Sequence, residues 1–237
     1  MCGRYASTHD PGDLAMEFDA EVAIGEDAPP PDYNVAPTKP VYAIRERHSQ
    51  PEREVNVMRW GLIPSWAKDP SIGSRLLNAR AETLVTSGAF KKAAAARRCL
   101  VPTDGWFEWK RLDDVAGKQP YFMTPRDGSL LAFAGLYEFW RPSRDEGEWL
   151  VSCTIVTTEA LGELADIHDR MPLVLPRDRW QAWLDPERKD PKPLLSPAPE
   201  LLDGLELRPV GRAVGNVENN GPELLARVES TPPQTLF

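Results

Sequence analysis

Short apolar stretches, rich in β-branched and aromatic residues, recur along the chain and predict most of its strands. Pro, Gly or Asp bounds these stretches, as is typical of strand ends. The predicted strands are VYAIRE (41–46), VNVMRW (55–60), RCLVPTDGWFEW (98–109), YFM (121–123), LLAFAGLYEFW (130–140), WLVSCTIVTT (149–158) and PLVL (172–175). Because several of them follow one another directly, we expect a mainly antiparallel, curved sheet.

Helical patterns lie at irregular intervals between these strands. In DPGDLAMEF (10–18), Asp10 is a capping residue and Pro11 takes the first helical position. The other predicted helices are SGAFKKAAAARR (87–98), TEALGELADI (158–167) and PRDRWQAWL (176–184). The proline-rich segment 185–199 is predicted to be a surface loop. Strict alternation of strand and helix is missing, so the pattern predicts the α+β class.

The net charge and its distribution along the chain limit how this protein could bind nucleic acid. The 237 residues carry a net charge of −8, which argues against a protein that coats nucleic acid by bulk charge. The charge is uneven, however. Residues 75–110 carry seven basic and three acidic side chains, whereas residues 10–32 carry eight acidic and no basic ones. A local basic face is therefore compatible with the acidic total.

The three cysteines, Cys2, Cys99 and Cys153, are far apart and odd in number, which favours a reducing compartment. No CxxC or His/Cys spacing suggests zinc, and three histidines make a metal cluster unexpected. Neither an N-terminal apolar segment nor a run of about 18 apolar residues is present, so no secretion signal or membrane span is predicted. We expect a cytoplasmic protein without metal or cofactor.

Cys2 directly follows the initiator Met1. Removal of Met1 would leave an α-amine and a thiol two bonds apart, with unperturbed pKa values of roughly 7.7–8.0 and 8.5. Both groups then have a usable deprotonated fraction near neutral pH. The alternative is that Cys2 is simply a small residue in a tail. Behind it, Gly3 lets a backbone approach a ligand closely, and Arg4 could hold a phosphate.

The segment LLNARAET (76–83) is predicted to be a strand with Asn78, Arg80 and Glu82 on one face. One interpretation is an ordinary half-buried strand with a polar outer face. The other is a functional face, because a neutral amide beside a guanidinium suits the orientation of a polar substrate and the binding of phosphate.

The segment DGWFEWK (104–110) places Trp106, Glu108 and Lys110 on one strand face. Glu108 is then either a surface carboxylate paired with Lys110 or a group lining a cleft. In a cleft, partial desolvation would raise its pKa and suit it to acid–base chemistry.

The segment DIHDRMPLVL (166–175) places His168 in a polar turn, and Met171 must be extended because Pro172 follows it. The histidine is either structural or part of a site. Two further stretches, YNVAPT (33–38) and GRAVGNVENNG (211–221), are interpreted as turns, although the second could cradle an anion.

Seven motifs of this chain resemble, in order and spacing, those of the SOS-response-associated peptidase (SRAP) family. They are MCGRYA, YNVAPT, RWGLIPSWAKD, LLNARAET, CLVPTDGWFEWK, IHDRMPLVL and VGNVENNG. The resemblance covers residues 2 to about 225. It implies a single domain over 1–237, with a β-barrel-like sheet and peripheral helices.

The resemblance also implies a function, namely covalent capture of abasic sites in single-stranded DNA through a thiazolidine at Cys2. The family name reflects an ability to remove whatever precedes that cysteine. By motif position, the acid–base carboxylate corresponds to Glu108, the amide that orients the sugar to Asn78 and the histidine near the sugar oxygens to His168. The expected DNA contacts are Arg4, Arg80, Asn34, Pro37, Trp66 and Arg170. We expect a monomer that associates with the nucleoid when DNA is damaged.

Two other functions are left open by the residues alone. Glutamine amidotransferase domains also begin Met-Cys-Gly and use the thiol as nucleophile and the α-amine as base. They would not account for the GWFEW and IHDR motifs. A DNA-binding module that reads damage without covalent chemistry is the non-enzymatic alternative.

Overall fold

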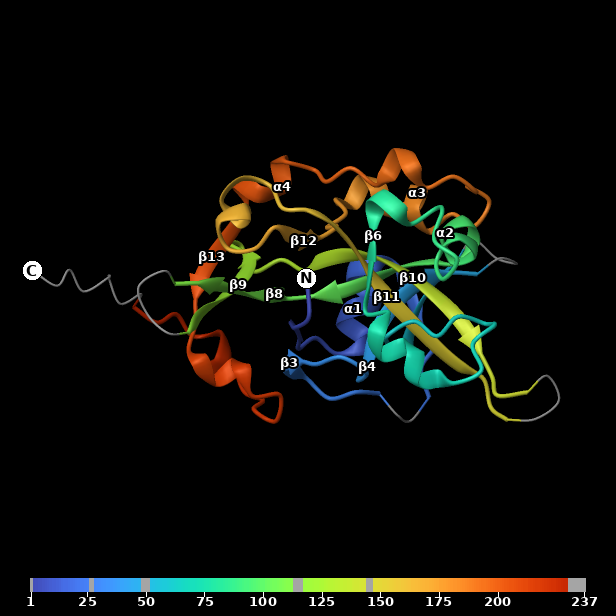
Figure 1. The fold of residues 1–237 in the computed structure, drawn as a ribbon, viewed down its shortest axis with the longest axis horizontal. Coiled ribbons are helices and arrows are strands. Elements are labelled where there is room, and N and C mark those ends of the chain that lie inside the picture. Colours follow the sequence, from blue (N-terminus) through green and yellow to red (C-terminus); the bar gives the residue numbers. More distant parts are fainter. Residues whose placement is uncertain (1, 26–27, 48–51, 113–116, 144–146, 230–237) are drawn as a thin grey trace, which may run out of the picture.

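Five long strands close into a barrel in the computed structural model, which describes residues 2–25, 28–47, 52–112, 117–143 and 147–229. They are β4 (Pro40–Glu46), β5 (Arg53–Trp60), β7 (Arg98–Thr103), β10 (Leu131–Trp140) and β11 (Leu150–Glu159). Antiparallel pairs run from β5 through β4, β7 and β10 to β11, and a parallel pairing of β11 with β5 closes the ring (Figure 1). The predicted α+β class with a barrel-like, mainly antiparallel sheet is confirmed.

Three short strands extend the barrel. β6 (Asn78–Arg80) pairs parallel with β11, β12 (Arg170–Pro172) pairs antiparallel with β11, and β2 (Ala20–Val22) pairs parallel with β5. The strand predicted over 76–83 is shorter than expected, because the 3₁₀ helix η2 (Ala81–Thr83) follows β6 directly. Strand β11 therefore carries two segments that are about 90 residues apart in sequence.

A second, antiparallel sheet lies against the barrel. Its order is β13 (Leu205–Pro209), β9 (Lys118–Pro125), β8 (Gly105–Arg111), β1 (Tyr5–Ser7) and β3 (Asp32–Val35). The sequence predicted none of β1, β3 and β13, and it interpreted 33–38 as a turn. Such short strands carry too little periodicity to be separated from turns.

The single strand predicted over 98–109 is in fact two strands that belong to different sheets. β7 ends at Thr103, whose hydroxyl donates to the Ala6 carbonyl at 2.8 Å and accepts from the Gly105 amide at 3.0 Å. A Cβ at Gly105 would lie 2.3 Å from the Met123 carbonyl oxygen, so only glycine fits this corner. The corner directs β8 away from the barrel.

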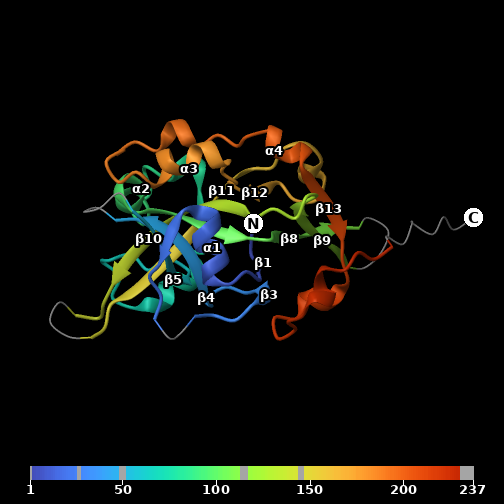
Figure 2. The same cartoon turned by 180° about the vertical axis from the view of Figure 1, so that it is seen from behind.

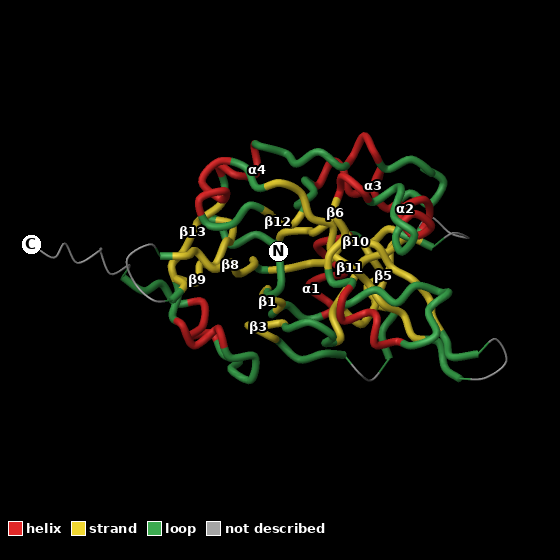
Figure 3. Tube along the Cα trace, viewed as in Figure 1, coloured by secondary structure: helices red, strands yellow, loops and turns green. Residues whose placement is uncertain are grey.

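Helices cover the outside of the sheets (Figures 2 and 3). They are α1 (Pro11–Phe18), α2 (Lys91–Ala96), α3 (Arg177–Leu184) and α4 (Glu200–Asp203), with 3₁₀ helices η1 (Pro70–Arg75), η3 (Gly162–Asp166), η4 (Lys192–Leu194), η5 (Arg212–Gly215) and η6 (Pro222–Leu225). The helix predicted over 158–167 is wrong, because β11 runs to Glu159 and pairs there with β12. Only the short η3 follows. No helix in the described part of the chain is long and apolar enough to cross a bilayer.

An aromatic cluster inside the barrel joins the two sheets. Tyr5 from β1 contacts Trp60 and Phe133 edge-on, with ring centroids 5.2 and 6.1 Å apart. Trp106 from β8 contacts the same Phe133 at 6.0 Å. All four rings are buried, and aromatic pairs in such edge-to-face contacts add about 0.5–1.5 kcal/mol beyond burial. This cluster holds β1 and β8, and hence the N-terminal segment, against the barrel.

Candidate active site around Cys2

Cys2 is fully buried at the start of the segment that leads into β1. The chain there lies beside β8, since Phe107 donates its backbone N–H to the Arg4 carbonyl at 3.0 Å. Burial raises the pKa of the Cys2 thiol, and the nearby Glu108 carboxylate raises it further. Met1, whose removal the sequence predicts, lies outside the described residues. Both ribbon views place the beginning of the described chain, which leads into β1, near the centre of the molecule (Figures 1 and 2).

Glu108 is buried on β8, with 4% of its surface exposed. It shares a strand face with Trp106 of the barrel cluster, whereas Phe107 packs against Phe122 on the opposite face. The surface-carboxylate alternative is therefore wrong. Burial raises the pKa of Glu108 to about 7, so this carboxyl group exchanges protons at neutral pH.

Asn78 binds the backbone of Cys2 directly. Its Nδ2 donates to the Cys2 carbonyl at 2.9 Å, and the parallel pairing of β6 with β11 sets its position opposite Ile155. Its Oδ1 is buried and has no hydrogen-bond partner among the described residues. An oxygen in that state can accept a hydrogen bond from a ligand hydroxyl.

His168 lies in the turn that precedes β12. The Arg170 backbone N–H donates to its Nδ1 at 3.0 Å, and the Asp169 carboxylate lies 2.9 Å from the same nitrogen. The amide contact favours an unprotonated Nδ1, whereas the carboxylate contact favours a protonated one. Burial lowers the pKa of His168, which agrees with a neutral ring, and Asp169 is exposed to solvent.

Four sequence-distant segments therefore meet at one place. Asn78 contacts Cys2 by a hydrogen bond, the charge of Glu108 acts on the Cys2 thiol, and the charge of Asp169 raises the Glu108 pKa further. The predicted catalytic residues thus bring a buried thiol, a buried carboxyl group, an imidazole and an amide into one region.

Arg4 is anchored rather than free. Its Nη1 donates to Asn34 Oδ1 at 2.7 Å and to the Val214 carbonyl at 2.8 Å, while its Nη2 donates to the Gly215 carbonyl at 3.3 Å. Asn34 is fully buried, and its Nδ2 donates to the carbonyls of Val214, Asn216 and Asn219. Asn34 therefore supports the DNA-contact prediction only indirectly, through the placement of Arg4 and of the 212–219 loop.

The two other predicted arginines differ in their surroundings. The Arg80 side chain, at the end of β6, is exposed and makes no hydrogen bond or ion pair within the described ranges, although its charge acts on the Glu82 carboxylate. Arg170 binds the Glu82 carboxylate with both terminal nitrogens, at 2.7 and 3.1 Å. Its Nη2 also donates to the Thr157 carbonyl at 2.8 Å. Both terminal nitrogens of Arg170 are thus bonded to acceptors of the protein, and its contact with DNA stays a prediction.

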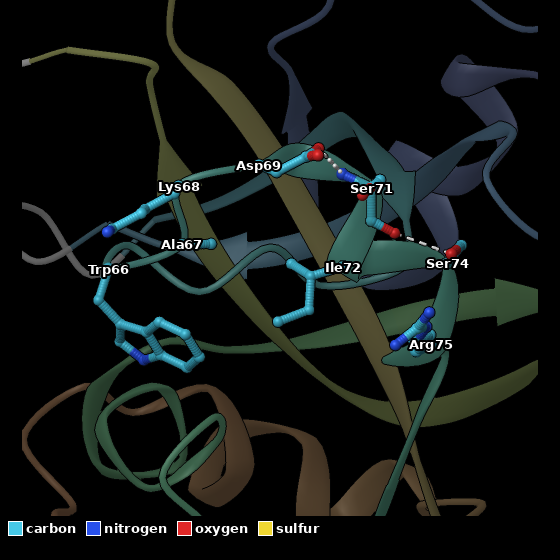
Figure 4. A pocket seen from close by; sticks show the side chains of 8 residues that line it. All are labelled: Trp66, Ala67, Lys68, Asp69, Ser71, Ile72, Ser74 and Arg75. Atoms are coloured by element: carbon cyan, nitrogen blue, oxygen red, sulfur yellow. Dashed lines mark hydrogen bonds between the residues drawn. The ribbon is translucent and has the colours of Figure 1, made fainter.

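Trp66 lies on the rim of an open cavity of about 540 Å³, and Pro37 is half-buried elsewhere on the surface. Figure 4 shows the cavity lining, in which the Trp66 indole and Arg75 lie on opposite sides with Ile72 between them, and Lys68 extends away from the ring. Trp66 is 58% exposed, which is unusual for so large an apolar side chain. Lys68 and Arg75 were not among the predicted contacts, although both lie in or near the RWGLIPSWAKD motif. Among the described residues, no cluster of three His, Cys, Asp or Glu side chains could hold a metal ion.

Comparison with known proteins identifies the family. The family model described as SOS response associated peptidase (SRAP) matches residues 1–217. The chain belongs to this family. This SRAP chain is 40% identical to the abasic site processing protein YoqW of Bacillus subtilis, over 95% of its length and 99% of the relative's. It is 35% identical to the abasic site processing protein YedK of Escherichia coli, covering 96% and 100%.

The fold agrees with this assignment. A crystal structure of a protein from Bacteroides thetaiotaomicron superposes on this SRAP chain with a TM-score of 0.83 at 25% identity, covering 96% of this chain and 100% of the other. The family predicted from the seven sequence motifs is thus confirmed.

The predicted position of Glu82 was wrong. The sequence analysis put Glu82 on the same strand face as Asn78 and Arg80, but β6 ends at Arg80 and Glu82 belongs to η2. Its partner Arg170 is 88 positions away in sequence, so no local pattern could have shown the pair.

Proposed function

We propose that this protein processes abasic sites in DNA by capturing them covalently, in single-stranded DNA, through Cys2. The relatives YoqW and YedK are both named abasic site processing proteins, and their similarity extends over nearly the whole chain. The observation that carries the finer proposal is the convergence of Asn78 and Glu108 on the buried Cys2. Capture would shield the lesion during the response to DNA damage.

The chemistry uses both nucleophiles of an N-terminal cysteine. The ring-opened sugar of an abasic site presents an aldehyde. The Cys2 α-amine attacks that carbon, water leaves and an imine forms. The thiol then adds to the C=N carbon, its proton passes to the nitrogen, and a five-membered thiazolidine closes. The second step is intramolecular and gains the high effective concentration of a tethered group.

The neighbouring side chains have separate roles in this scheme. Glu108, with a pKa of about 7, takes a proton from the Cys2 ammonium and returns it when water leaves. His168 donates a hydrogen bond to the sugar oxygen during ring opening, while the proton that this oxygen takes up comes from the Glu108 carboxyl group. Asn78 Oδ1 accepts a hydrogen bond from the open-chain hydroxyl.

Contacts outside the reacting centre bind the strand. Arg80 is the exposed cation that would bind a backbone phosphate, which positions the strand without reading its sequence. Trp66 offers an exposed indole on which a base can stack, a contact worth about 1–3 kcal/mol per base. Pro37 is proposed to pack against a base at the strand edge.

A denaturing gel of the protein with single-stranded DNA that carries one abasic site tests the proposal. We expect a heat-stable adduct whose mass equals protein without Met1 plus DNA minus one water. Cys2→Ser retains the amine but has a poorer second nucleophile, so it should give a labile imine that borohydride traps. A Cys2→Ser adduct as stable as that of the wild type would contradict the role of sulfur.

The same preparation separates the alternatives. Glutamine hydrolysis without a DNA adduct would favour an amidohydrolase. Binding of abasic DNA without adduct or hydrolysis would favour a non-covalent module. Full activity with Met1 still in place would also refute the thiazolidine, because the Cys2 nitrogen would be a peptide nitrogen.

A further inference from the structure

The cavity beside Trp66 lies at the start of the segment that leads to Asn78. Its volume of about 540 Å³ falls in the range of about 300–1,000 Å³ that is usual for ligand pockets. Arg75, the last residue of η1, lines the cavity and comes three positions before Asn78 in the chain. Three residues span at most about 11 Å, so the cavity is close to the residue that binds the Cys2 carbonyl.

Hydrogen bonds to the barrel fix the short connection between the cavity and β6. The Leu62 backbone N–H donates to the Leu76 carbonyl at 3.1 Å. The Leu77 carbonyl accepts from the Ile155 N–H at 3.1 Å and from the Trp60 indole N–H at 3.0 Å. The distance between the cavity and the candidate active site is therefore set by the fold.

The two walls of the cavity are also held by the barrel. Beside Trp66, the Ala67 carbonyl accepts from the Trp140 indole N–H at 2.7 Å. In the opposite wall, Gly73 of η1 approaches Gly61 so closely that a Cβ on either residue would lie 2.5–2.6 Å from the other's carbonyl oxygen. Because both walls are fixed in this way, the cavity is formed before any ligand arrives.

The lining combines an aromatic face with an unpaired guanidinium. The Trp66 indole is 58% exposed, and Arg75 lies on the opposite side of the cavity with Ile72 between them (Figure 4). Within the described part of the chain, the Arg75 side chain is exposed and makes no hydrogen bond or ion pair. Bases stack on exposed aromatic rings, and guanidinium groups bind phosphate. These are the two kinds of group that recognise a nucleotide.

The charges of the lining also favour an anionic ligand. Lys68 and Arg75 are both cations without a partner among the described residues, whereas Asp69 is the one acidic residue of the lining. The Asp69 carboxylate already accepts from the Ser71 backbone N–H at 2.8 Å, where it caps η1. A purely apolar partner on the indole would leave both cations without a counter-charge. A nucleotide supplies a ring for the indole and a phosphate for the cations.

We propose that this cavity is a subsite for one nucleotide near the lesion, whose base stacks on Trp66 and whose phosphate binds Arg75. The inference rests on the proposed function and adds the place of a neighbouring nucleotide to it. The fixed connection to Asn78 then sets the register between this nucleotide and the sugar at Cys2. Stacking accepts every base and a phosphate contact reads none, so the subsite positions the strand without selecting its sequence.

The stacking contact is tested with oligonucleotides that carry tetrahydrofuran, an abasic analogue without an aldehyde, so that binding is measured without adduct formation. The flanking bases are removed one at a time by placing the same analogue at each position. At one position, loss of the base should weaken wild-type binding by about 5- to 150-fold. In Trp66→Ala the same change should have no further effect, whereas Trp66→Phe keeps a ring and most of the sensitivity.

The phosphate contact is tested by salt dependence between about 50 and 200 mM. Arg75→Gln should flatten the slope of log affinity against log salt by about 0.7, so that over this fourfold rise it loses about 2.6-fold less affinity than the wild type. An uncharged methylphosphonate at the phosphate of the coupled nucleotide should flatten the wild-type slope equally and that of Arg75→Gln no further. Arg188→Gln removes a matched exposed arginine from the loop after α3 and should keep the wild-type slope.

A structural role for either residue would give a different pattern. Misfolding, which thermal melting detects, would weaken the binding of every oligonucleotide by the same factor. If no single base couples to Trp66, or no single phosphate couples to Arg75, the subsite is refuted. If the wild type forms no adduct with a true abasic site, the proposed chemistry fails while these binding comparisons stay valid. If it forms the adduct and no position is coupled, only the subsite fails.

Discussion

A single carboxyl group shows how burial turns a common residue into a reagent. An exposed glutamate is almost fully ionised at neutral pH and is a weak base. Burial of Glu108 on β8 raises its pKa to about 7, which places proton exchange in the working range. This burial lowers the free energy of unfolding when Glu108 is ionised, because the buried carboxylate has no access to bulk water. Two predictions at this scale use the same substitution, Glu108→Gln.

Glu108→Gln should slow the formation of the DNA adduct. Glu108→Gln keeps the size of the side chain but removes the proton acceptor, and loss of general acid–base catalysis typically costs about 10²- to 10⁴-fold. The adduct should therefore form much more slowly than in the wild type near pH 6–7, where the Cys2 amine is mostly protonated. The rate should partly recover near pH 9, where the amine is already free. Gel assays across this pH range measure both. No loss at any pH would remove Glu108 from the mechanism.

Glu108→Gln should also change how the free energy of unfolding depends on pH. The raised pKa means that the folded protein holds the Glu108 proton more tightly than the unfolded chain, whose ordinary value is 4.5. This contribution is present below about pH 4.5 and is lost as pH rises through about 7. Glu108→Gln does not titrate, so it should gain about 2–3 kcal/mol on the wild type between about pH 5 and 8. Urea unfolding of the variant and the wild type, at about pH 5 and at about pH 8, measures the difference in unfolding free energy. An equal difference at both would show that burial does not perturb this group.

At the scale of elements, the loop around η5 works as a support for the N-terminal segment. Its carbonyls accept from Asn34 and from Arg4, so β3, the segment before β1 and the 212–219 loop form one hydrogen-bonded unit. The sequence marks this loop only as a series of Gly and Asn residues. Its partners lie about 180 or more positions away in the chain.

Asn34→Ala tests this unit. The substitution leaves the Asn216 and Asn219 carbonyls without their donor, removes one of the two donors of the Val214 carbonyl and removes one of the three acceptors of Arg4. We therefore expect a loss of about 2–4 kcal/mol of unfolding free energy. DNA binding at low salt should weaken as Arg4 loses its orientation. Asn219→Ala removes an amide that makes one exposed hydrogen bond, so it should cost less than about 1 kcal/mol. Equal losses for the two variants would show that Asn34 has no special role.

At the scale of the whole molecule, the barrel positions the candidate site through short strands that pair with its edge. β11 closes the ring with β5 and also carries β6 and β12, which bring Asn78 and the His168 turn into place. The acidic total charge is concentrated elsewhere, in part over residues 10–32. Cys2 packs in the same buried cluster as Cys99 of the barrel interior, and we predict that changes on the far side of that cluster alter stability without altering the chemistry.

Gly135→Ala tests this separation. Gly135 on β10 faces Cys99, and an added Cβ would lie 2.8 Å from its Sγ and 3.2 Å from the Thr154 carbonyl oxygen. Overpacking of this kind typically costs about 1–3 kcal/mol. Cys99→Ala should recover part of that loss in the double variant, because it vacates the space. Adduct formation per folded molecule should be unchanged in all three. A lower rate in folded Gly135→Ala would show that the barrel interior and the site are coupled.

The sequence by itself determined the family, the α+β class and the long strands. Seven ordered motifs are specific together, and strands such as those over 41–46 and 130–140 have enough apolar residues to be recognised locally. It also offered Cys2, Asn78, Glu108 and His168 as candidates.

Only the tertiary structure decided what these residues experience. The fold buries Glu108, and that burial raises its pKa to about 7. Neither the strand period nor the neighbouring residues could distinguish this buried group from a surface carboxylate paired with Lys110. The splitting of 98–109 at Gly105 and the binding of Arg170 by Glu82 depend on contacts with segments distant in the chain. Desolvation and ion pairing arise from three-dimensional neighbours, and a linear pattern carries no information about which distant residues those will be.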